Sequence, residues 1–481
     1  MSPTDHLRTM LDGLIWRGRG WSRRWTARIG APGRRNAAAG EDDTSDLAPL
    51  ARLLLSGRGQ SSGIRMAAEL LDAYAELDRA GRLRFMRQLF EQFGPDRAQL
   101  SDAWRQWQAD ESRAAFSGLA RAIEPPRQEL FRRLNMAPMG TAALVAMRAD
   151  LLAMIADDPN LAPELGVVDD DLFHLLQSWF NRGFLVMRRI DWSSSADLLE
   201  RIVRYEAVHN IATWDELRDR LLPEDRRCYA FFHPAMADEP LIFVEVALGN
   251  AVAGSIQDVL AHDRSPLPVA DARVAIFYSI SNCQAGLAGI SFGHFLIKQV
   301  VQQLARELPL LSTFATLSPV PRFGRWLRTE AEAGNVAAGE YSDLLDRPEA
   351  LADLEPDSDA AFQLRSLALH YLMEAKDGRG LPADPVARFH LGNGARLENL
   401  CWMGDRSARG LAQSAGFMVN YLYDLQTIED NHEAFAGEGR IALGEPIRRL
   451  AREIEKGKGT GTRHAGDNLH DLSRPLLGRA R

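Results

Sequence analysis

The chain has 481 residues, of which 46% are apolar and 25% are charged, and its formal net charge is −8. This length exceeds what one hydrophobic core usually serves, so we expect two domains. The negative charge argues against a general nucleic-acid binder, whose surface must neutralise phosphates. No run of 18 uncharged apolar residues occurs, so no membrane-spanning helix is predicted.

The cysteines indicate a reducing compartment. Cys228, Cys283 and Cys401 form no C-x-x-C pair and are too few for a disulfide framework. We therefore interpret them as buried or incidental thiols.

The first 45 residues form a basic arm that we expect to be disordered. Residues 1–35 contain eight arginines and two acidic residues, a composition that mitochondrial transit peptides share. We favour a disordered arm on a cytoplasmic bacterial enzyme, and keep a mitochondrial matrix enzyme with a transit peptide as the alternative. The chain ends in Gly-Arg-Ala-Arg481 and not in Ser-Lys-Leu, so we do not expect a peroxisomal enzyme.

Residues 46–180 have the periodicity of a helical domain. Apolar residues recur at spacings of three and four within residues 70–77, 85–93 and 144–154. Proline-rich breaks at Pro125-Pro126 and Pro159–Pro163 separate the predicted helices. We predict a bundle of roughly six to eight helices that carries no chemical motif and mediates packing or homo-oligomerisation.

Residues 181–456 alternate between predicted strands and helices, so the fold class is α+β. Apolar, β-branched and aromatic runs typical of buried strands occupy Arg227–Phe232, Leu241–Leu248, Ala272–Ile280 and Ser312–Leu317. Helices are predicted at Ser195–Tyr205, Trp214–Leu222, Gly293–Leu308, Gly324–Gly334 and Ala360–Glu374. Residues 457–481 have the composition of a disordered tail.

The loop after the strand at 272–280 contains Gly286, Gly289 and Gly293. Free amides at a helix N-terminus bind phosphate, and glycines let a backbone approach a pyrophosphate closely. The spacing does not fit G-x-G-x-x-G, and no Walker lysine follows. The loop is therefore either a phosphate-binding turn or a glycine-rich turn shaped by packing alone.

Ser318 follows the last predicted strand, in Thr316-Leu-Ser-Pro-Val-Pro321. Side chains at the carboxyl ends of strands in open α/β sheets face the ligand crevice. A Ser-Pro pair is also a routine turn or helix N-cap, which the residues alone favour. No G-x-S-x-G elbow surrounds the serine, which argues against a serine hydrolase.

His390 lies between two apolar residues, just before the glycine-rich turn 392–394. A lone histidine in such a place is commonly a hydrogen-bonded core residue, but the turn can bring its ring to a pocket wall. The segment 389–424 continues with Asn420 and Tyr423, and few of its residues serve helix or strand propensity. No other histidine or carboxylate lies at metal-ligand spacing, so we predict no metal.

Together, three segments resemble malonyl-CoA decarboxylase. They are Ser-Ile-Ser-Asn-Cys-Gln-Ala-Gly-Leu-Ala-Gly-Ile-Ser-Phe-Gly (279–293), Leu-Ser-Pro-Val-Pro (317–321), and residues 388–424, with Phe-His-Leu-Gly-Asn-Gly and Asn-Tyr-Leu-Tyr. The resemblance extends from Phe180 to Asp424. It implies an N-terminal helical domain, a C-terminal catalytic domain of the GNAT (N-acetyltransferase superfamily) fold, and a homo-oligomer.

The resemblance also implies residue roles. The family's catalytic pair is the serine of Leu-Ser-Pro and the histidine of Phe-His-Leu, which here are Ser318 and His390. Tyr423 matches the second tyrosine of the family's Asn-Tyr-x-Tyr motif, and Asn393 is a further candidate for orienting the substrate or His390. The implied CoA-binding residues are Ala288, Gly289, Ile290, Ser291, Phe292, Gly293 and His294.

The implied reaction is decarboxylation of malonyl-CoA to acetyl-CoA and CO2 through a thioester enolate, in malonate or fatty-acid metabolism. Because the thioester is itself the electron sink, we expect no metal or organic cofactor. We assign proton donation to His390, since the unperturbed pKa of imidazole lies near neutrality. Ser318 would hydrogen-bond the malonyl carboxylate or accept a proton.

Two rival interpretations share the CoA loop. An acyl-CoA N-acetyltransferase would release CoA thiol in the presence of an amine, without CO2. A non-catalytic acyl-CoA sensor would have no reason to retain Ser318, His390 and the Asn-Tyr-Leu-Tyr segment together.

Overall fold

The computed structural model describes residues 46–57, 59–290 and 296–459, which form two units. The first unit contains the described residues up to Trp179 together with Ala285–Ala288. The second contains Phe180–Gln284 and the described residues from Gly289 onward. No helix in these ranges is long and apolar enough to cross a membrane.

Some predicted features lie outside the described residues. They are the basic arm, residues 460–481 of the predicted tail, and Ser291, Phe292, Gly293 and His294 of the predicted CoA segment. The predicted tail also begins too early, because the last helix continues through Gly459.

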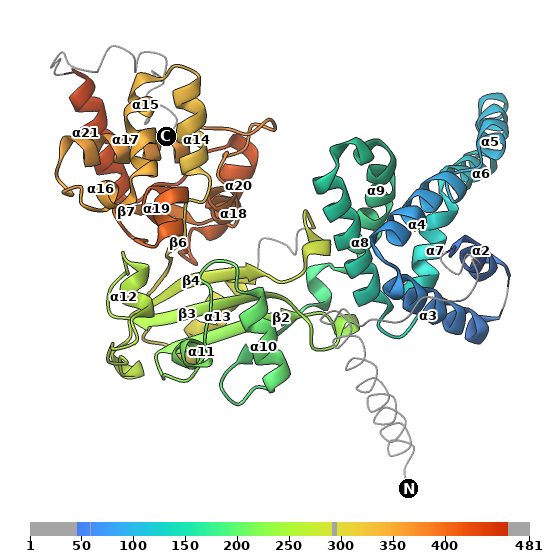
Figure 1. Cartoon of the computed structure of the whole chain (residues 1–481), viewed down its shortest axis with the longest axis horizontal. Coiled ribbons are helices and arrows are strands. Elements are labelled where there is room, and N and C mark those ends of the chain that lie inside the picture. Colours follow the sequence, from blue (N-terminus) through green and yellow to red (C-terminus); the bar gives the residue numbers. More distant parts are fainter. Residues whose placement is uncertain (1–45, 58, 291–295, 460–481) are drawn as a thin grey trace, which may run out of the picture. The chain divides into compact units, whose positions relative to one another are not determined.

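The first unit is a helical bundle, as predicted for this region (Figure 1). Its core contains buried residues at helical spacing, such as Leu70, Leu71 and Tyr74. Pro126 is the first residue of a helix, where a backbone amide would have no hydrogen-bond partner within the helix, so the missing amide hydrogen of proline costs nothing. The α-helices of its described part are α2 (Ala48–Leu55), α3 (Gln60–Glu76), α4 (Arg79–Gln92), α5 (Arg97–Ala109), α6 (Arg113–Ile123), α7 (Pro126–Asn135), α8 (Gly140–Asp157) and α9 (Ala162–Trp179).

The second unit is built on one mixed sheet in the order β1-β2-β3-β4-β5-β8-β6, with β7 paired to β8. The pairings between the named strands are antiparallel except that of β4 with β5, which is parallel. The strands are β1 (Val186–Ile190), β2 (Arg226–Phe232), β3 (Pro240–Gly249), β4 (Val274–Asn282), β5 (Thr313–Thr316), β6 (Ser318–Pro319), β7 (Arg396–Cys401) and β8 (Met418–Leu422).

Helices cover both faces of this sheet. Cys228 and Phe243 share a hydrophobic cluster with α10 (Ala196–Tyr205) and α11 (Trp214–Leu221) on one face. Tyr229 points the other way, since neighbouring strand residues alternate, and its hydroxyl donates to Glu307 of α13 (Leu296–Glu307). The remaining α-helices are α12 (Ile256–Leu260), α14 (Phe323–Glu332), α15 (Val336–Ser342), α16 (Pro348–Ala352), α17 (Asp359–Met373), α18 (Pro385–Gly392), α19 (Ala408–Ser414), α20 (Ile428–Glu438) and α21 (Glu445–Gly459).

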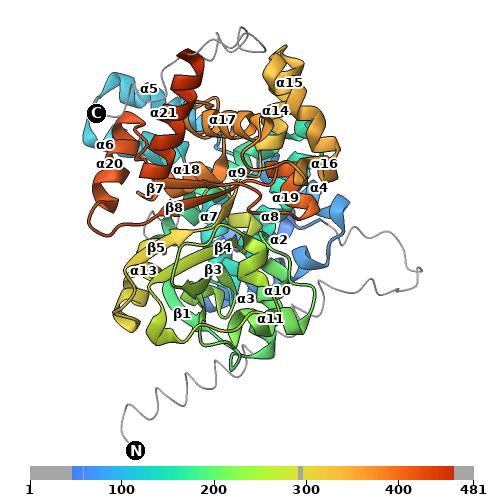
Figure 2. The ribbon, with the colours of Figure 1, turned by 90° about the vertical axis from the view of Figure 1, so that its left-hand side faces the viewer.

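The chain changes its pairing partner in the sheet between β5 and β6. β4 and β5 pair only as far as Phe277 with Thr316, although β4 continues to Asn282. The chain after β5 pairs instead with β8, through Ser318 and Val419. Figure 2 shows β5, β7 and β8 side by side, with α21 against β7. This exchange of partners removes Ser318 from the β4 ladder.

The predicted α+β fold class is confirmed, with a helical bundle before a domain of mixed strands and helices. The four predicted strands correspond to β2–β5, and the five predicted helices to α10, α11, α13, α14 and α17. Segment 389–424, few of whose residues serve helix or strand propensity, contains the end of α18, β7, α19 and β8. Polar residues lower the strand propensity of β7 and β8, but their mutual pairing overrides it.

Candidate active site

His390 is positioned by the short helix α18. The Asp384 carboxylate caps this helix, accepting hydrogen bonds of 2.9 Å from the amides of Val386 and Ala387. Pro385 occupies the first turn. His390 lies in the last turn, where it is only 2% exposed. The cap therefore fixes the start of a helix whose end presents the imidazole.

The chain reverses immediately after His390. Gly394 has a φ of +80°, a left-handed conformation that favours glycine. A Cβ at this position would lie 2.0 Å from the Ile428 carbonyl oxygen. The turn 392–394 therefore needs glycine at its last position for two independent reasons.

Three strands, β5, β6 and β8, bring the partners of His390. Thr316 ends β5 and Ser318 begins β6, so their side chains share one face at a spacing of two residues. Tyr421 in β8 and Tyr423 just beyond it are related in the same way, and the amide of Tyr423 donates to Phe314 of β5. All four side chains are buried.

A continuous hydrogen-bond chain joins these residues. The Ser318 hydroxyl donates to Thr316 Oγ1 at 2.9 Å, and Ser318 Oγ lies 3.0 Å from His390 Nε2. Because the serine proton is directed to Thr316, its oxygen accepts from Nε2–H. Nδ1 then accepts from the Tyr423 hydroxyl at 2.8 Å. This order of donors and acceptors specifies the neutral tautomer of His390 that carries its proton on Nε2.

Burial determines the protonation of the site. It lowers the pKa of His390 to about 3, so the imidazole is neutral near pH 7. The expectation of a histidine that titrates near neutrality is therefore wrong. Burial also raises the pKa of Tyr423 well above its usual range, so its hydroxyl keeps the proton that it donates to Nδ1.

The structure brings together Ser318, His390 and Tyr423 but places Asn393 differently. The Asn393 amide donates to the Phe389 carbonyl oxygen at 2.6 Å and closes the end of α18. The Asn393 side chain therefore supports the helix that carries His390, and this bond goes to the helix backbone and not to the imidazole ring. Of the predicted CoA segment, Ala288, Gly289 and Ile290 are described; Gly289 has a φ of +80° and Ile290 is buried.

Sequence reasoning assigned no role to Thr316 or Tyr421. Thr316 accepts from Ser318, and the Tyr421 ring stacks on His390 with centroids 4.6 Å apart and an interplanar angle of 23°. Each residue precedes a predicted site residue by two positions. The two-residue alternation of strands was the signal that could have found both of them.

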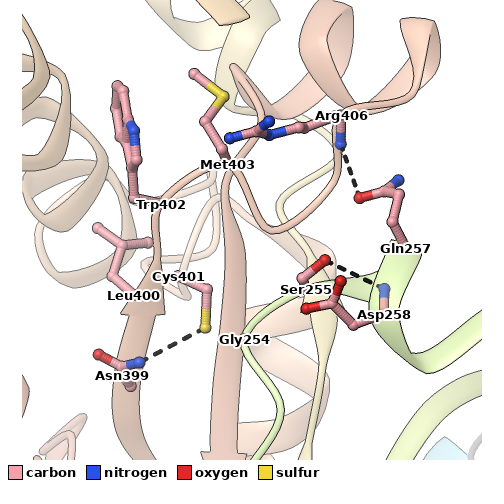
Figure 3. Close-up of a pocket in the computed structure, with 10 residues that line it drawn as sticks. All are labelled: Gly254, Ser255, Gln257, Asp258, Asn399, Leu400, Cys401, Trp402, Met403 and Arg406. Carbon is pink, nitrogen blue, oxygen red and sulfur yellow. Dashed lines mark hydrogen bonds between the residues drawn. The ribbon is translucent and has the colours of Figure 1, made fainter. Parts of the chain in front are cut away.

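A polar cavity of about 650 Å³ lies at the end of β7 (Figure 3). Asn399 Nδ2 donates to Cys401 Sγ, as Figure 3 shows, and Cys401 in turn donates to Asn420 Oδ1 at 3.1 Å. Asn420 Nδ2 donates to the Thr316 carbonyl oxygen at 2.8 Å. Asn420 points away from its neighbour Tyr421, so the cavity lies across β8 from the His390 ring. It is lined by Gly254, Ser255, Gln257, Asp258, Asn399, Leu400, Cys401, Trp402, Met403 and Arg406.

Comparison with known proteins identifies the family. The family model "Malonyl-CoA decarboxylase C-terminal domain" matches residues 183–460, more than half of the chain, and "Malonyl-CoA decarboxylase N-terminal domain" matches residues 93–180. The chain belongs to the malonyl-CoA decarboxylase family. The resemblance found in the three sequence segments is thereby confirmed.

Members of the family with known sequences or structures match most of the chain. The mitochondrial malonyl-CoA decarboxylase of Anser anser anser is 32% identical over 427 residues, which cover 82% of this chain and 84% of that protein. The crystal structure of malonyl-CoA decarboxylase from Rhodopseudomonas palustris is 51% identical with a TM-score of 0.77, and covers 84% of this chain and 99% of its own. That from Agrobacterium vitis is 47% identical with a TM-score of 0.76, and covers 85% and 99%.

Metal ligands do not gather within the residues that the structure describes. These residues contain no group of three or more histidine, cysteine, aspartate or glutamate side chains that could hold a metal ion. The polar groups around Ser318 and His390 are instead hydroxyls and the imidazole, which donate and accept protons.

Proposed function

We propose that the chain decarboxylates malonyl-CoA to acetyl-CoA and CO2, with Ser318, His390 and Tyr423 as the residues that carry the reaction. Family membership supports the reaction and its substrate. The single observation that supports the site is the hydrogen-bond chain from Ser318 through both imidazole nitrogens to Tyr423.

The reaction needs an electron sink and a proton. The bond between the α-carbon and the carboxylate carbon breaks, CO2 leaves, and the electron pair enters the thioester as an enolate. The α-carbon then takes one proton to give acetyl-CoA. Because the thioester carbonyl accepts the electron pair, the proposed reaction requires no metal or organic cofactor.

His390 is the proposed proton donor, acting as a neutral imidazole. Its Nε2–H points at Ser318 Oγ, and burial keeps the ring neutral. A thioester enolate is basic enough at carbon to take a proton from neutral imidazole. Burial disfavours an imidazolium, whose charge would lose its hydration there. The imidazolate left after the transfer regains its proton from water before the next turnover. A positioned donor of this kind typically contributes ~10²–10⁴-fold to the rate.

Ser318 is proposed to bind the reacting end of the substrate. Its hydroxyl is 6% exposed and lies within hydrogen-bond distance of Nε2, the atom that releases the proton. A malonyl carboxylate or enolate oxygen that replaces Thr316 as the partner of this hydroxyl comes to lie beside Nε2–H. A preorganised donor to a developing oxyanion contributes about 3 kcal/mol in comparable sites.

Tyr423 is proposed to support His390 rather than the substrate. As Nε2 gives up its proton, negative charge develops on the ring and the hydrogen bond from the Tyr423 hydroxyl to Nδ1 strengthens. The tyrosine also selects the tautomer with the proton on Nε2, because it occupies Nδ1 with a donor.

The deciding experiment is product release by the purified chain from malonyl-CoA, with no amine, metal or biotin added. Equal amounts of CO2 and acetyl-CoA, lost in His390→Ala, are expected. CoA thiol released only when an amine is present would show an N-acetyltransferase. Tight CoA binding without CO2 would show a sensor. Either of these outcomes would reject the proposed function.

We also propose a homo-oligomer that forms through the first unit. α5 buries none of its residues, and α6 buries only Leu119. Trp104, Phe116 and Ile123 on these helices are 50%, 56% and 55% exposed, and Figure 1 shows both helices extending from the rest of that unit. Exposed apolar side chains gathered in one region are typical of an interface. Light scattering of the wild type and of Trp104→Glu/Phe116→Glu tests this, and a monomeric wild type would reject it.

The proposed location is the bacterial cytoplasm. The identities of 51% and 47% to proteins of the bacteria Rhodopseudomonas palustris and Agrobacterium vitis, against 32% to a mitochondrial relative, support this proposal. Cell fractionation of the source organism tests it.

A further inference from the structure

The connection between β4 and α13 passes through the other unit. After β4 ends at Asn282, the Gln284 side chain donates to the Pro240 carbonyl oxygen at 3.0 Å, within the second unit. The next four residues, Ala285–Ala288, belong to the first unit, and from Gly289 the chain belongs to the second unit again. The last of these four residues, Ala288, is also the first residue of the predicted CoA segment.

Arg148 of α8 holds this excursion by its backbone. Nη1 of Arg148 donates to the carbonyl oxygens of Gly286 at 2.8 Å and Ala288 at 2.9 Å. The side chain is only 3% exposed and its bond to Gly286 is buried, whereas its bond to Ala288 is partly buried. Buried hydrogen bonds from a charged donor are stronger than neutral ones, and they fix the two carbonyls relative to α8.

The guanidinium is itself fixed by α9. Nε and Nη2 of Arg148 donate to the two Asp169 carboxylate oxygens at 2.6 and 3.3 Å, and the guanidinium carbon lies 5.2 Å from the centre of the Phe173 ring. Asp169 thus satisfies the buried charge and leaves Nη1 free to point at the excursion. Arginine suits this position better than lysine, which cannot present donors to a carboxylate and two carbonyls in one plane.

Gly286 brings the excursion close enough for these bonds. A Cβ at Gly286 would lie 1.8 Å from the Val145 carbonyl oxygen and 3.1 Å from the Ala149 amide nitrogen, both in the backbone of α8. The excursion therefore lies directly on the helix backbone, and any side chain at position 286 would lift it away. Leu287, between the two bonded carbonyls, is buried at 4% exposure.

We infer that Arg148 is a positioning residue for coenzyme A binding, acting by fixing the first residue of the CoA segment on α8. This inference rests on the proposed function. The hydrogen bonds of Arg148 go to Asp169, Gly286 and Ala288. Its loss should therefore weaken substrate binding and leave the rate of the chemical step unchanged. A residue that contributes binding equally to the ground and transition states changes KM and not kcat.

The test is the steady-state kinetics of Arg148→Gln with malonyl-CoA, together with the affinity of the same variant for coenzyme A by calorimetry. KM and the Kd for coenzyme A should each rise roughly tenfold or more, with kcat within about threefold of the wild type. Arg148→Lys should give an intermediate KM. Unchanged KM and Kd in Arg148→Gln would overturn the inference, as would a fall confined to kcat.

Arg82→Gln is the matched control. Arg82 also pairs with an α8 carboxylate, Asp150, at 2.9 Å and donates to a backbone carbonyl, that of Ala75, at 3.0 Å, but it is not bonded to the excursion. An equal rise in KM in this control would show a general loss of stability and reject the inference.

Gly286→Ala provides a second route to the same contact if Arg148→Gln does not fold. It disturbs the contact sterically and keeps every charge. Because both changes act on one contact, the double variant should have a KM close to that of the worse single variant. Multiplied effects would show that the two residues act separately and would reject the inference. Wild-type CO2 release, measured first, separates failure of this inference from failure of the proposed function.

Discussion

Removal of the Tyr423 hydroxyl tests the proposed site at a single bond. In Tyr423→Phe the ring is kept, including its edge contact with Phe277 at 6.5 Å between centroids. Only the 2.8 Å hydrogen bond to His390 Nδ1 is lost. Since His390 is 2% exposed, water cannot replace the donor without a rearrangement.

The size of the effect follows from that burial. A buried acceptor left without a partner costs about 1–3 kcal/mol. If this cost falls on the transition state for proton transfer, kcat falls about 5- to 150-fold, at 1.36 kcal/mol per factor of ten. KM should stay within about twofold, because the proposed role of Tyr423 is confined to the imidazole.

The assay is the initial rate of CO2 and acetyl-CoA release over a range of malonyl-CoA concentrations, with stability measured in parallel by urea denaturation. Tyr229→Phe is the control, because its buried hydroxyl also makes a 2.8 Å bond in the second unit, to Glu307. Both variants should lose about 1 kcal/mol of unfolding free energy. A wild-type kcat in Tyr423→Phe, or an equal fall in kcat in both variants, would refute the reasoning.

Four further predictions follow from the same geometry. Ser318→Ala should lower kcat about 100-fold with little change in the Kd for coenzyme A, measured by kinetics and calorimetry; near-native kcat would contradict the role of Ser318. Because burial keeps His390 neutral, kcat should show no inflection near pH 6.5, and a kcat that falls as pH rises through 6.5 would show that an imidazolium is needed. Burial lowers the folded-state pKa of His390 to about 3 and that of His209 to about 4, so their contribution to stability is complete above pH 6.5 and declines as pH falls toward 4. Urea denaturation at pH 7 and pH 5 should show this, at up to about 1.4 kcal/mol per pH unit for each histidine, and His209→Gln should reduce the slope. Gly394→Ala should destabilise the fold by about 2–3 kcal/mol, since its φ is +80° and a Cβ would meet Ile428, and an unchanged urea midpoint would show that the turn relaxes.

The residues of the site could be predicted from sequence only through the family resemblance. By local pattern, Ser318 was better interpreted as a helix cap and His390 as a core residue. The two residues are 72 positions apart, and Ser318 is placed by the pairing of β6 with β8, whereas His390 is placed by α18. Such pairing depends on the sheet as a whole and leaves no local periodicity to detect.

The protonation of His390 could not be predicted for a related reason. Its two sequence neighbours are apolar, but they do not decide its burial. Tyr421 stacks on one face of the ring and Tyr423 occupies Nδ1, and these residues, in β8 and just beyond it, lie more than thirty positions away. The start of α18 is easier to predict from sequence, because Asp384 followed by Pro385 is a recognisable signal for the N-terminus of a helix.

The glycines of the predicted CoA loop show where sequence reasoning is ambiguous. A glycine is required equally by a backbone that approaches a phosphate and by a backbone that approaches another backbone. For Gly286 the structure provides the second cause, because the Val145 carbonyl occupies the place of a side chain. For Gly289 it provides a third, a left-handed φ of +80° at the point where the chain returns to the second unit. Neither of these two glycines therefore argues for phosphate by itself, and a role of this loop in binding coenzyme A depends on the family match and on the KM of the Arg148 variants.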